Sequence, residues 1–340
     1  MDLLKITFFV PNLKHFETGE VCSMAGPAFV PISVTGTTCS LMCDHCSAKI
    51  LESMFSAETP DVLKDLLVRL AADGCTGALI TGGSDAGGRV PLEPFEDVMK
   101  FAREELGLRI AVHTGIVSRR TALSLKRAKV AVAMTDIVGS AETLNRVCHL
   151  PAGPSAYLES LLNLADAGVP MSPHVVIGLD YGHIRGEMKA IDMIASVPVN
   201  SAVLVVLKPT RGTPMEGVAP PVLDSVREVF AYARSRLVRV PLLLGCARPP
   251  GSYGHELEKM AVDLGFDGIA YPSDGLVSYA AQKGYSVNVR YECCSMVFET
   301  SAPHCQSVAH HRGREDSQGI RKGAGHPDGQ EADAGRGFIC

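Results

Sequence analysis

Residues 32–46, ISVTGTTCSLMCDHC, decide the fold: an apolar, β-branched run ends at Gly36, and three cysteines follow it. Their spacing is Cys-x3-Cys-x2-Cys, at Cys39, Cys43 and Cys46. The apolar run is typical of a buried strand, so the cysteines are expected on the loop after the first strand of the fold. Three thiols on one short loop converge on one point, and the sequence has no further cysteine close to them.

Such a loop is suited to a [4Fe–4S] cluster. Clusters of this type are held by cysteine thiolates, and three ligands leave one iron open to a small molecule. The alternative is a zinc site, in which a fourth ligand such as His45 joins Cys39, Cys43 and Cys46. Structural zinc usually takes paired CxxC or CxxH knuckles, and this chain has no second knuckle. The spacing therefore favours the cluster.

Length and composition argue against several classes of protein. The chain has 340 residues, of which 46% are hydrophobic and 20% charged, which is enough to bury a large core. A net charge of -5 argues against nucleic-acid binding as the main function. No apolar run approaches the roughly 20 residues that cross a bilayer, and the N-terminus does not resemble a signal peptide. We therefore expect a cytoplasmic protein without a membrane partner, in which clustered cysteines bind metal.

Apolar runs alternate with amphipathic stretches after the N-terminal segment. Strands are predicted at Ile32–Thr35, Gly77–Thr81, Arg109–His113, Val130–Met134, His174–Gly178, Ala202–Leu207, Val240–Gly245 and Gly268–Tyr271. Helices are predicted at Pro60–Ala72, Pro94–Glu105, Ser155–Ala167, Glu187–Ala195, Pro221–Arg236, His255–Leu264 and Gly275–Lys283. Strands that are apolar without alternation belong in a parallel sheet covered by helices. Eight such units predict an α/β fold, a (β/α)8 TIM-type barrel. An open doubly wound sheet is the alternative, but the first turn lacks GxGxxG.

The barrel is predicted over residues 31–298. Residues 1–30 carry scattered turn signals and are expected to form a lead-in segment that covers one end of the fold. Residues 299–340 are rich in Gly, His, Arg and Asp and nearly free of large apolar side chains. Such a segment cannot bury enough surface to fold alone, so we predict a disordered tail. Its abrupt change of composition leaves a frame-shifted or appended end as an alternative.

Several polar residues stand at the carboxyl ends of predicted strands, where parallel barrels bind their ligands. Gly82, Gly83 and Ser84 follow the second strand, and paired glycines let a backbone approach a ligand closely. Asp136 follows the fourth strand, and its carboxylate is a natural acceptor for ribose hydroxyls. His113, at the end of the third strand, is either a core histidine or a ligand.

Three further cysteines lie late in the chain. Cys246 follows the seventh predicted strand, and Cys293 and Cys294 follow the last predicted helix. A buried cysteine is normally a small hydrophobic residue, which is one interpretation. The other is that the three cysteines hold a second iron–sulfur cluster. The remaining cysteines, Cys148 among them, are interpreted as incidental.

Together these motifs resemble the radical S-adenosylmethionine (SAM) superfamily over about residues 25–298. The cysteine loop, the glycine pair, the turn Ile177–Leu179 and the stretch Pro209–Pro214 carry the likeness. Within the superfamily the chain resembles the biotin synthase and lipoyl synthase branch. The segments ISVTGTTCSLMCDHC, GGSDAGGRVP and GCARPPGSY, with the late Cys-Cys pair, are similar to biotin-synthase-related proteins of archaea and bacteria. That group includes subunits of a two-protein lipoyl synthase.

The resemblance implies a mechanism. A [4Fe–4S] cluster on Cys39, Cys43 and Cys46 reductively cleaves SAM to a 5′-deoxyadenosyl radical, which abstracts hydrogen from the substrate. The residues implied to contact SAM are His45, Gly82, Gly83, Ser84 (where the family has Glu), Asp136, Gly178 and Thr213. In the sulfur-inserting branch, an auxiliary cluster on Cys246, Cys293 and Cys294 supplies sulfur to an octanoyl group on a lipoyl-carrier protein. Further implied partners are an electron donor such as ferredoxin or flavodoxin and a second radical SAM subunit.

Two other functions stay open. A radical SAM enzyme with one cluster would perform different chemistry, such as rearrangement, methylation or peptide modification. A metal-stabilised barrel without catalysis would only scaffold a partner. Iron content separates one cluster, with about four irons per chain, from two clusters, with about eight.

Overall fold

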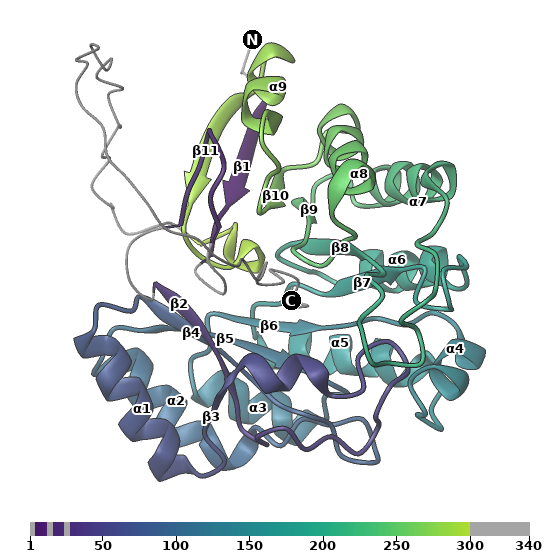
Figure 1. Ribbon diagram of the computed structural model, residues 1–340. Coiled ribbons are helices and arrows are strands. Elements are labelled where there is room, and N and C mark those ends of the chain that lie inside the picture. The colour runs from purple at the N-terminus through teal and green to yellow at the C-terminus, as the bar shows by residue number, and fades with distance from the viewer. Residues whose placement is uncertain (1–3, 12–15, 24–27, 300–340) are drawn as a thin grey trace, which may run out of the picture.

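A computed structural model describes residues 4–11, 16–23 and 28–299 of the chain, so all but the first residue of the predicted tail lies outside the described residues. Parallel strands form the interior and helices cover them (Figure 1). The strands are β1 (Lys5–Phe9), β2 (Phe29–Ser33), β3 (Phe55–Ser56), β4 (Gly77–Thr81), β5 (Arg109–Thr114), β6 (Val132–Thr135), β7 (His174–Ile177), β8 (Ala202–Val206), β9 (Leu242–Leu244), β10 (Gly268–Ala270) and β11 (Ser286–Arg290).

The strand order confirms the predicted TIM-type barrel. One ladder runs β3-β2-β4-β5-β6 and the other β7-β8-β9-β10-β1-β11, with all pairs parallel. Isolated parallel bridges, Ala133 with Met171 and Asp136 with His174, join the two ladders between β6 and β7. Apart from β3, which pairs with the other side of β2, the strands from β2 to β10 therefore follow one another around the barrel. Within the described residues, β3 and β11 are its two edges, and no ladder pairs them.

Helices lie outside the strands (Figure 1). The α-helices are α1 (Pro60–Ala72), α2 (Glu96–Glu104), α3 (Arg119–Arg127), α4 (Ala141–Arg146), α5 (Ser155–Ala167), α6 (Glu187–Ala195), α7 (Leu223–Arg236), α8 (Gly251–Asp263) and α9 (Leu276–Gln282), with short 3-10 turns η1 (Lys49–Ser53), η2 (Glu93–Phe95) and η3 (Cys294–Met296). The Thr59 and Ser118 side chains cap α1 and α3 by accepting backbone N–H bonds. Among the helices of the described residues, none combines the length and the apolar character needed to cross a membrane.

The predicted elements are largely present. Helices α1, α5 and α6 begin and end at the predicted residues. The continuous apolar sequence of β8, AVLVV, is buried at every position, as expected for a strand covered on both faces. The predicted first strand is shifted: β2 begins earlier, at Phe29, because its ladder with β4 pairs Phe29 with Gly77 and Ser33 with Thr81.

The N-terminal segment contributes a strand that the sequence pattern did not predict. β1 lies between β10 and β11 and pairs in parallel with both (Figure 1). Its Phe8 and Phe9 side chains are fully buried. A run of five residues is too short for periodicity to distinguish a strand from a buried helix segment.

After β11 the chain turns back into the barrel. Cys293 packs in one apolar group with Phe29, and Cys294 packs in another with residues of β8 and β9. Glu292 is buried and forms an ion pair with Arg109, the first residue of β5. Because Phe29 and Arg109 begin their strands, this segment fills the barrel toward the amino ends of β2 and β5. The carboxyl ends stay available for a site.

Candidate functional site

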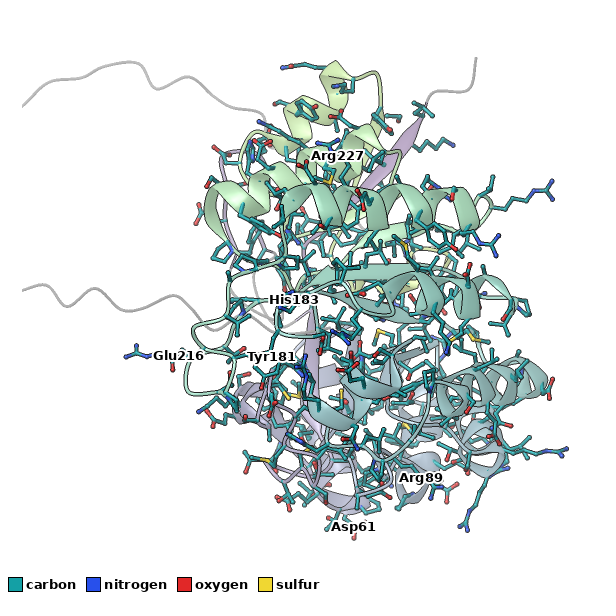
Figure 2. The ribbon with its side chains drawn as sticks, turned by 90° about the vertical axis from the view of Figure 1, so that its right-hand side faces the viewer. Asp61, Arg89, Tyr181, His183, Glu216 and Arg227 are labelled. Carbon is teal, nitrogen blue, oxygen red and sulfur yellow. The ribbon has the colours of Figure 1, made fainter. Side chains whose placement is uncertain are left out.

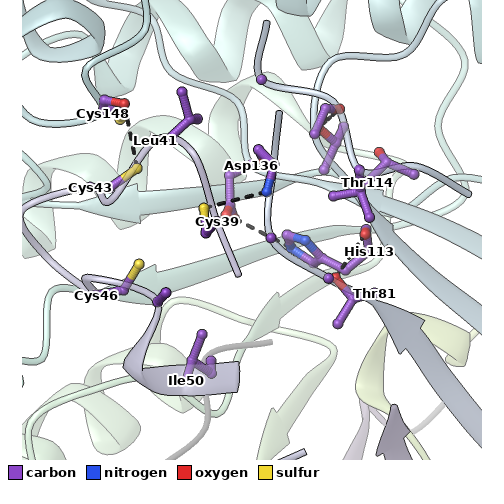
Figure 3. A pocket seen from close by; sticks show the side chains of 18 of the residues that line it. Cys39, Leu41, Cys43, Cys46, Ile50, Thr81, His113, Thr114, Asp136 and Cys148 are labelled. Atoms are coloured by element: carbon purple, nitrogen blue, oxygen red, sulfur yellow. Dashed lines mark hydrogen bonds and ion pairs between the residues drawn. The ribbon is translucent and has the colours of Figure 1, made fainter. Parts of the chain in front are cut away.

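The cysteine loop lies at the carboxyl end of β2, as predicted. Cys39, Cys43 and Cys46 are each partly buried and line one pocket. The empty volume of this pocket, including its opening to solvent, is about 1090 Å³. Figure 3 shows the three sulfur atoms facing a common space. The pocket opens at the face where parallel barrels bind their ligands, so it is the candidate site for a cofactor.

The thiols on this loop are unequal. A hydrogen bond from Cys43 holds the pKa of Cys46 well below its usual range, although burial acts in the opposite direction. Hydrogen bonds with Cys148 and Cys46 raise the pKa of Cys43. Thiolates, not thiols, bind iron. The arrangement therefore favours the thiolate at Cys46 and the neutral thiol at Cys43.

His45 lies beside Cys46. Burial alone would lower the pKa of His45, but the charge of Cys46 and a hydrogen bond to it raise that pKa to about 9. The ring Nδ1 is buried and has no hydrogen-bond partner among the described residues. The ring lines the pocket, where it can stack on a ligand or bind a metal. Its contact with SAM stays a prediction.

The three thiols of the loop suit an iron–sulfur cluster better than a single metal ion. In the described part of the chain, no group of three or more His, Cys, Asp or Glu side chains is placed to hold one metal ion. A four-iron cluster is wider than one ion and spreads its thiolates further apart. Cys39, Cys43 and Cys46 all line the pocket and would hold the cluster there, once the close thiols of Cys43 and Cys46 separate.

The glycine pair, Gly82 and Gly83, packs closely against the cysteine loop. A Cβ added to Gly83 would stand 2.0 Å from the carbonyl oxygen of Thr38 and 2.6 Å from the Cα of Cys39. The backbone N–H of Ser84 points at the Cys39 sulfur, 3.4 Å away (Figure 3). Gly82, Gly83 and Ser84 all line the pocket. Because the glycines have no side chains, the backbone of Cys39 can lie close to them, and a ligand can approach their own backbone.

Three ionisable side chains lie together here: His113 and Asp136 line the pocket, and His174 packs against His113. The Nε2 of His113 is 3.7 Å from the Oδ1 of Asp136 (Figure 3), and the ring of His174 meets the His113 ring edge-on with centroids 5.6 Å apart. Burial alone would lower the pKa of His113 and raise that of Asp136. The charge of Asp136 raises the pKa of His113 instead, and the charge of His113 lowers the pKa of Asp136. Burial lowers the pKa of His174 to about 4. The shifts therefore favour a charged pair of His113 and Asp136 beside a neutral His174 imidazole.

Gly178 and Thr213 do not line this pocket. Gly178 has a φ of 77°, and a Cβ there would stand 2.2 Å from the Cγ of Pro221. The hydroxyl of Thr213 donates to the carbonyl of Thr210 at 2.7 Å. Figure 2 shows Glu216 of the same loop projecting from the body of the protein. The contacts of Gly178 and Thr213 with SAM stay predictions.

The late cysteines meet inside the barrel. Cys293 and Cys294 are each 1% exposed. The Cys294 thiol lies within hydrogen-bonding reach of Cys293 and close enough to Cys246 for their charges to interact. The Cys293 sulfur is 4.0 Å from the Met134 sulfur. The structure brings the three residues into one region, and the second cluster stays a prediction.

Sequence reasoning missed Cys148. It lines the pocket beside Cys43, although 105 residues separate the two along the chain. The one feature of the sequence that could have indicated Cys148 as a site residue is its position after the fourth predicted strand. Parallel barrels bind ligands at that face. Tyr157, Thr114 and Gly115 also line the pocket and were not predicted.

Comparisons with known proteins show the fold. The sequence matches none of the protein-family models and none of the curated proteins compared with it. The solved structure of methylornithine synthase (PylB) is 12% identical with a TM-score of 0.55, over 86% of this chain and 85% of that one. HydG, a maturase of the [FeFe]-hydrogenase, is 15% identical with a TM-score of 0.56, over 84% and 66%.

A third structure is SuiB of Streptococcus suis bound to S-adenosylmethionine. It is 13% identical with a TM-score of 0.51, over 71% of this chain. The match covers 53% of SuiB, so this chain spans about half of its length. Identities this low establish a common architecture and no shared activity. The chain has the barrel fold of methylornithine synthase, HydG and SuiB.

Proposed function

We propose that the protein is a radical SAM enzyme, with a [4Fe–4S] cluster held by Cys39, Cys43 and Cys46. The observation that carries this proposal is the position of the three thiols, which line one pocket at the carboxyl ends of a parallel barrel. Barrels of this type bind substrates and cofactors at that face. The fold likeness to PylB, HydG and SAM-bound SuiB supports the proposal.

The residues of this chain would supply placement and protection. When bound, the cluster and SAM supply a 5′-deoxyadenosyl radical that removes hydrogen from an unactivated carbon. The turn at Gly83 and Ser84 holds Cys39 in position. Asp136, whose pKa is lowered by His113, is an ionised acceptor suited to the ribose hydroxyls of SAM. Apolar lining residues such as Leu41 would limit the access of water to the radical.

We propose sulfur insertion as the reaction, with an octanoyl group on a lipoyl-carrier protein as substrate. The support is the meeting of Cys246, Cys293 and Cys294 inside the barrel, where they would hold an auxiliary cluster. A ferredoxin or flavodoxin would donate the electron, and a second radical SAM subunit would take part. Such a reaction is expected in the cytoplasm, where these donors are found.

A single-cluster radical SAM enzyme is the second candidate. The ion pair of His113 and Asp136 in the pocket wall favours it, because these groups suit a polar substrate better than an alkyl chain. In that case Cys293 and Cys294, which are nearly fully buried, are small core residues. Substrate polarity and iron content therefore separate the two candidates.

The test begins with anaerobic reconstitution of the protein with iron and sulfide. We expect about four irons per chain for one cluster or about eight for two. Dithionite-reduced protein should convert SAM to 5′-deoxyadenosine. The triple variant Cys39→Ala, Cys43→Ala, Cys46→Ala should lose this activity and about four irons. A Cys75→Ala variant, altered outside the pocket, is the control.

Sulfur insertion has its own test. Replacing Cys246, Cys293 and Cys294 by Ala should lower the iron content by about four per chain if a second cluster is present. Mass analysis of an octanoylated carrier protein after turnover should then show added sulfur with the wild type alone. Unchanged iron content in the late-cysteine variant would exclude the auxiliary cluster, and absence of SAM cleavage by the reduced wild type would refute the enzyme proposal.

A further inference from the structure

Cys148 places a fourth thiol beside the cysteine loop. The thiols of Cys43 and Cys148 lie within hydrogen-bonding reach of each other. The Cys43 sulfur is also 3.5 Å from the backbone carbonyl oxygen of Cys148 (Figure 3). Neither residue is in a disulfide bond. Cys148 is 6% exposed and Cys43 is half-buried, so Cys43 is the more accessible of the two.

Other contacts hold the two residues together. The backbone N–H of Asp44 donates to the carbonyl of Val147 at 2.9 Å. The Asp44 carboxylate pairs with Nε2 of His149, also at 2.9 Å. His149 has a φ of 53°, in the left-handed region that is costly for a residue with a side chain. Val147 and His149, on either side of Cys148, are therefore both bonded to Asp44, which directly follows Cys43.

We propose that Cys43 and Cys148 form a disulfide bond when the loop is without its cluster. The bond is a switch that decides whether the loop can take up iron and sulfide. This inference rests on the proposed function in one respect, that Cys43 is a cluster ligand. Once Cys43 is oxidised, Cys39 and Cys46 are left as the thiolates of the loop, which is too few for the three-thiolate site.

The oxidant is a small-molecule disulfide such as oxidised glutathione. Cys43, the more accessible thiol, loses its proton, attacks one of the sulfurs and releases the first small thiol, which leaves a mixed disulfide on Cys43. Cys148 then loses its proton, attacks the Cys43 sulfur and releases the second small thiol. The protein loses two electrons and two protons, and the small disulfide gains them. A reducing dithiol reverses the reaction.

The competing product is a bond between Cys43 and Cys46, whose thiols also lie close together. The two products differ in the length of chain that they enclose. A bond from Cys43 to Cys148 spans 105 residues, whereas the bond within the loop spans a few. A long closed loop restricts the unfolded chain more, so the proposed bond should raise Tm more than the competing one.

The experiment uses cluster-free full-length protein titrated with oxidised glutathione and quenched with N-ethylmaleimide. Peptide mass mapping should find a cross-link between Cys43 and Cys148. Uptake of iron and sulfide by the oxidised protein should fall at least about tenfold and return after a reducing dithiol is added. Cys148→Ser should keep full uptake after the same treatment. Cys75→Ser, which alters a buried cysteine away from the loop, should behave as the wild type.

The outcomes are distinguishable. A cross-link from Cys43 to Cys46 or Cys39, or a persistent block of uptake in Cys148→Ser, would overturn the inference. If instead the reduced wild type assembles no cluster, the proposed function fails, while mapping still reports whether the disulfide forms. Circular dichroism checks that Cys148→Ser is folded, and Cys148→Ala, which introduces no buried hydroxyl, is the second variant.

Discussion

The hydroxyl of Tyr181 donates a hydrogen bond to the carboxylate of Asp44, 137 residues earlier in the chain. Asp44 directly follows Cys43, and its second carboxylate oxygen pairs with His149. The guanidinium of Arg146 lies over the Tyr181 ring, 5.3 Å from its centroid. Figure 2 shows the position of Tyr181. The cysteine loop is therefore anchored to the connections after β6 and β7 as well as to its own strand.

Removing the Tyr181 hydroxyl should loosen this anchor. Tyr181→Phe keeps the ring but takes one partner from Asp44, at an expected cost of about 1 kcal/mol in unfolding free energy. We expect unchanged circular dichroism and faster loss of iron to a chelator from the reconstituted protein. Tyr232→Phe is the matched control, because Tyr232 donates to Asp192 outside the pocket. Equal rates of iron loss from the two variants would argue against the anchor.

Adding one methyl group at Gly83 should displace Cys39. The Cβ of Gly83→Ala would stand 2.0 Å from a backbone oxygen, so the loop must shift. We expect a loss of about 1–3 kcal/mol in urea unfolding and a lower iron content after reconstitution. Gly217→Ala is the control, since a Cβ at Gly217 meets no atom within 4 Å. If Gly83→Ala retains the iron content and stability of the control, the close packing has no role.

The buried ion pair of Arg248 and Glu258 should be important for stability. Their side chains are 6% and 4% exposed, and Arg248 also donates to the carbonyl of Gly245 at 2.7 Å. Glu258→Gln leaves a buried, uncompensated guanidinium, so we expect a loss of about 3–5 kcal/mol in unfolding free energy. Glu256→Gln removes the exposed partner of Lys259 and should cost at most about 1 kcal/mol. Similar losses in both variants would contradict the prediction.

Stability should fall on acidification, and His174 should account for much of the slope. Burial lowers its pKa from 6.5 to about 4. Between these values the unfolded chain binds a proton at this residue that the folded protein does not bind. The unfolding free energy therefore decreases as the pH falls through this window, by about 3 kcal/mol in total.

The groups that face His174 do not cancel this effect. The pKa of His113 is raised above 6.5, so His113 is charged in both the folded and the unfolded states at the acid end of the window. The pKa of Asp136 is lowered below 3.8, so its contribution is lost only in stronger acid. The Cys293 thiol also faces the ring. Urea unfolding at several pH values should show that the unfolding free energy of His174→Asn depends less on pH than that of the wild type. An unchanged dependence would mean that other groups cause the loss of stability in acid.

The sequence predicts best what is determined locally. Strands buried on both faces leave continuous apolar runs, and the cysteine spacing is a local motif, so both are readable from the chain. The positions of Cys148 and Tyr181 are not, because each meets the cysteine loop through packing across more than a hundred residues. The strands β1 and β11 were missed for a related reason, since their pairing joins the two ends of the described chain.

The place of β1 has a consequence for how the protein is made. Its partners begin at residues 268 and 286, so they leave the ribosome long after Lys5–Phe9 has emerged. Until then, two phenylalanines and a row of backbone donors and acceptors stay exposed, which is a template for wrong pairing between chains. β1 is therefore synthesised first but can pair with β10 and β11 only at the end of synthesis. Chaperone binding during translation should concentrate on this short stretch.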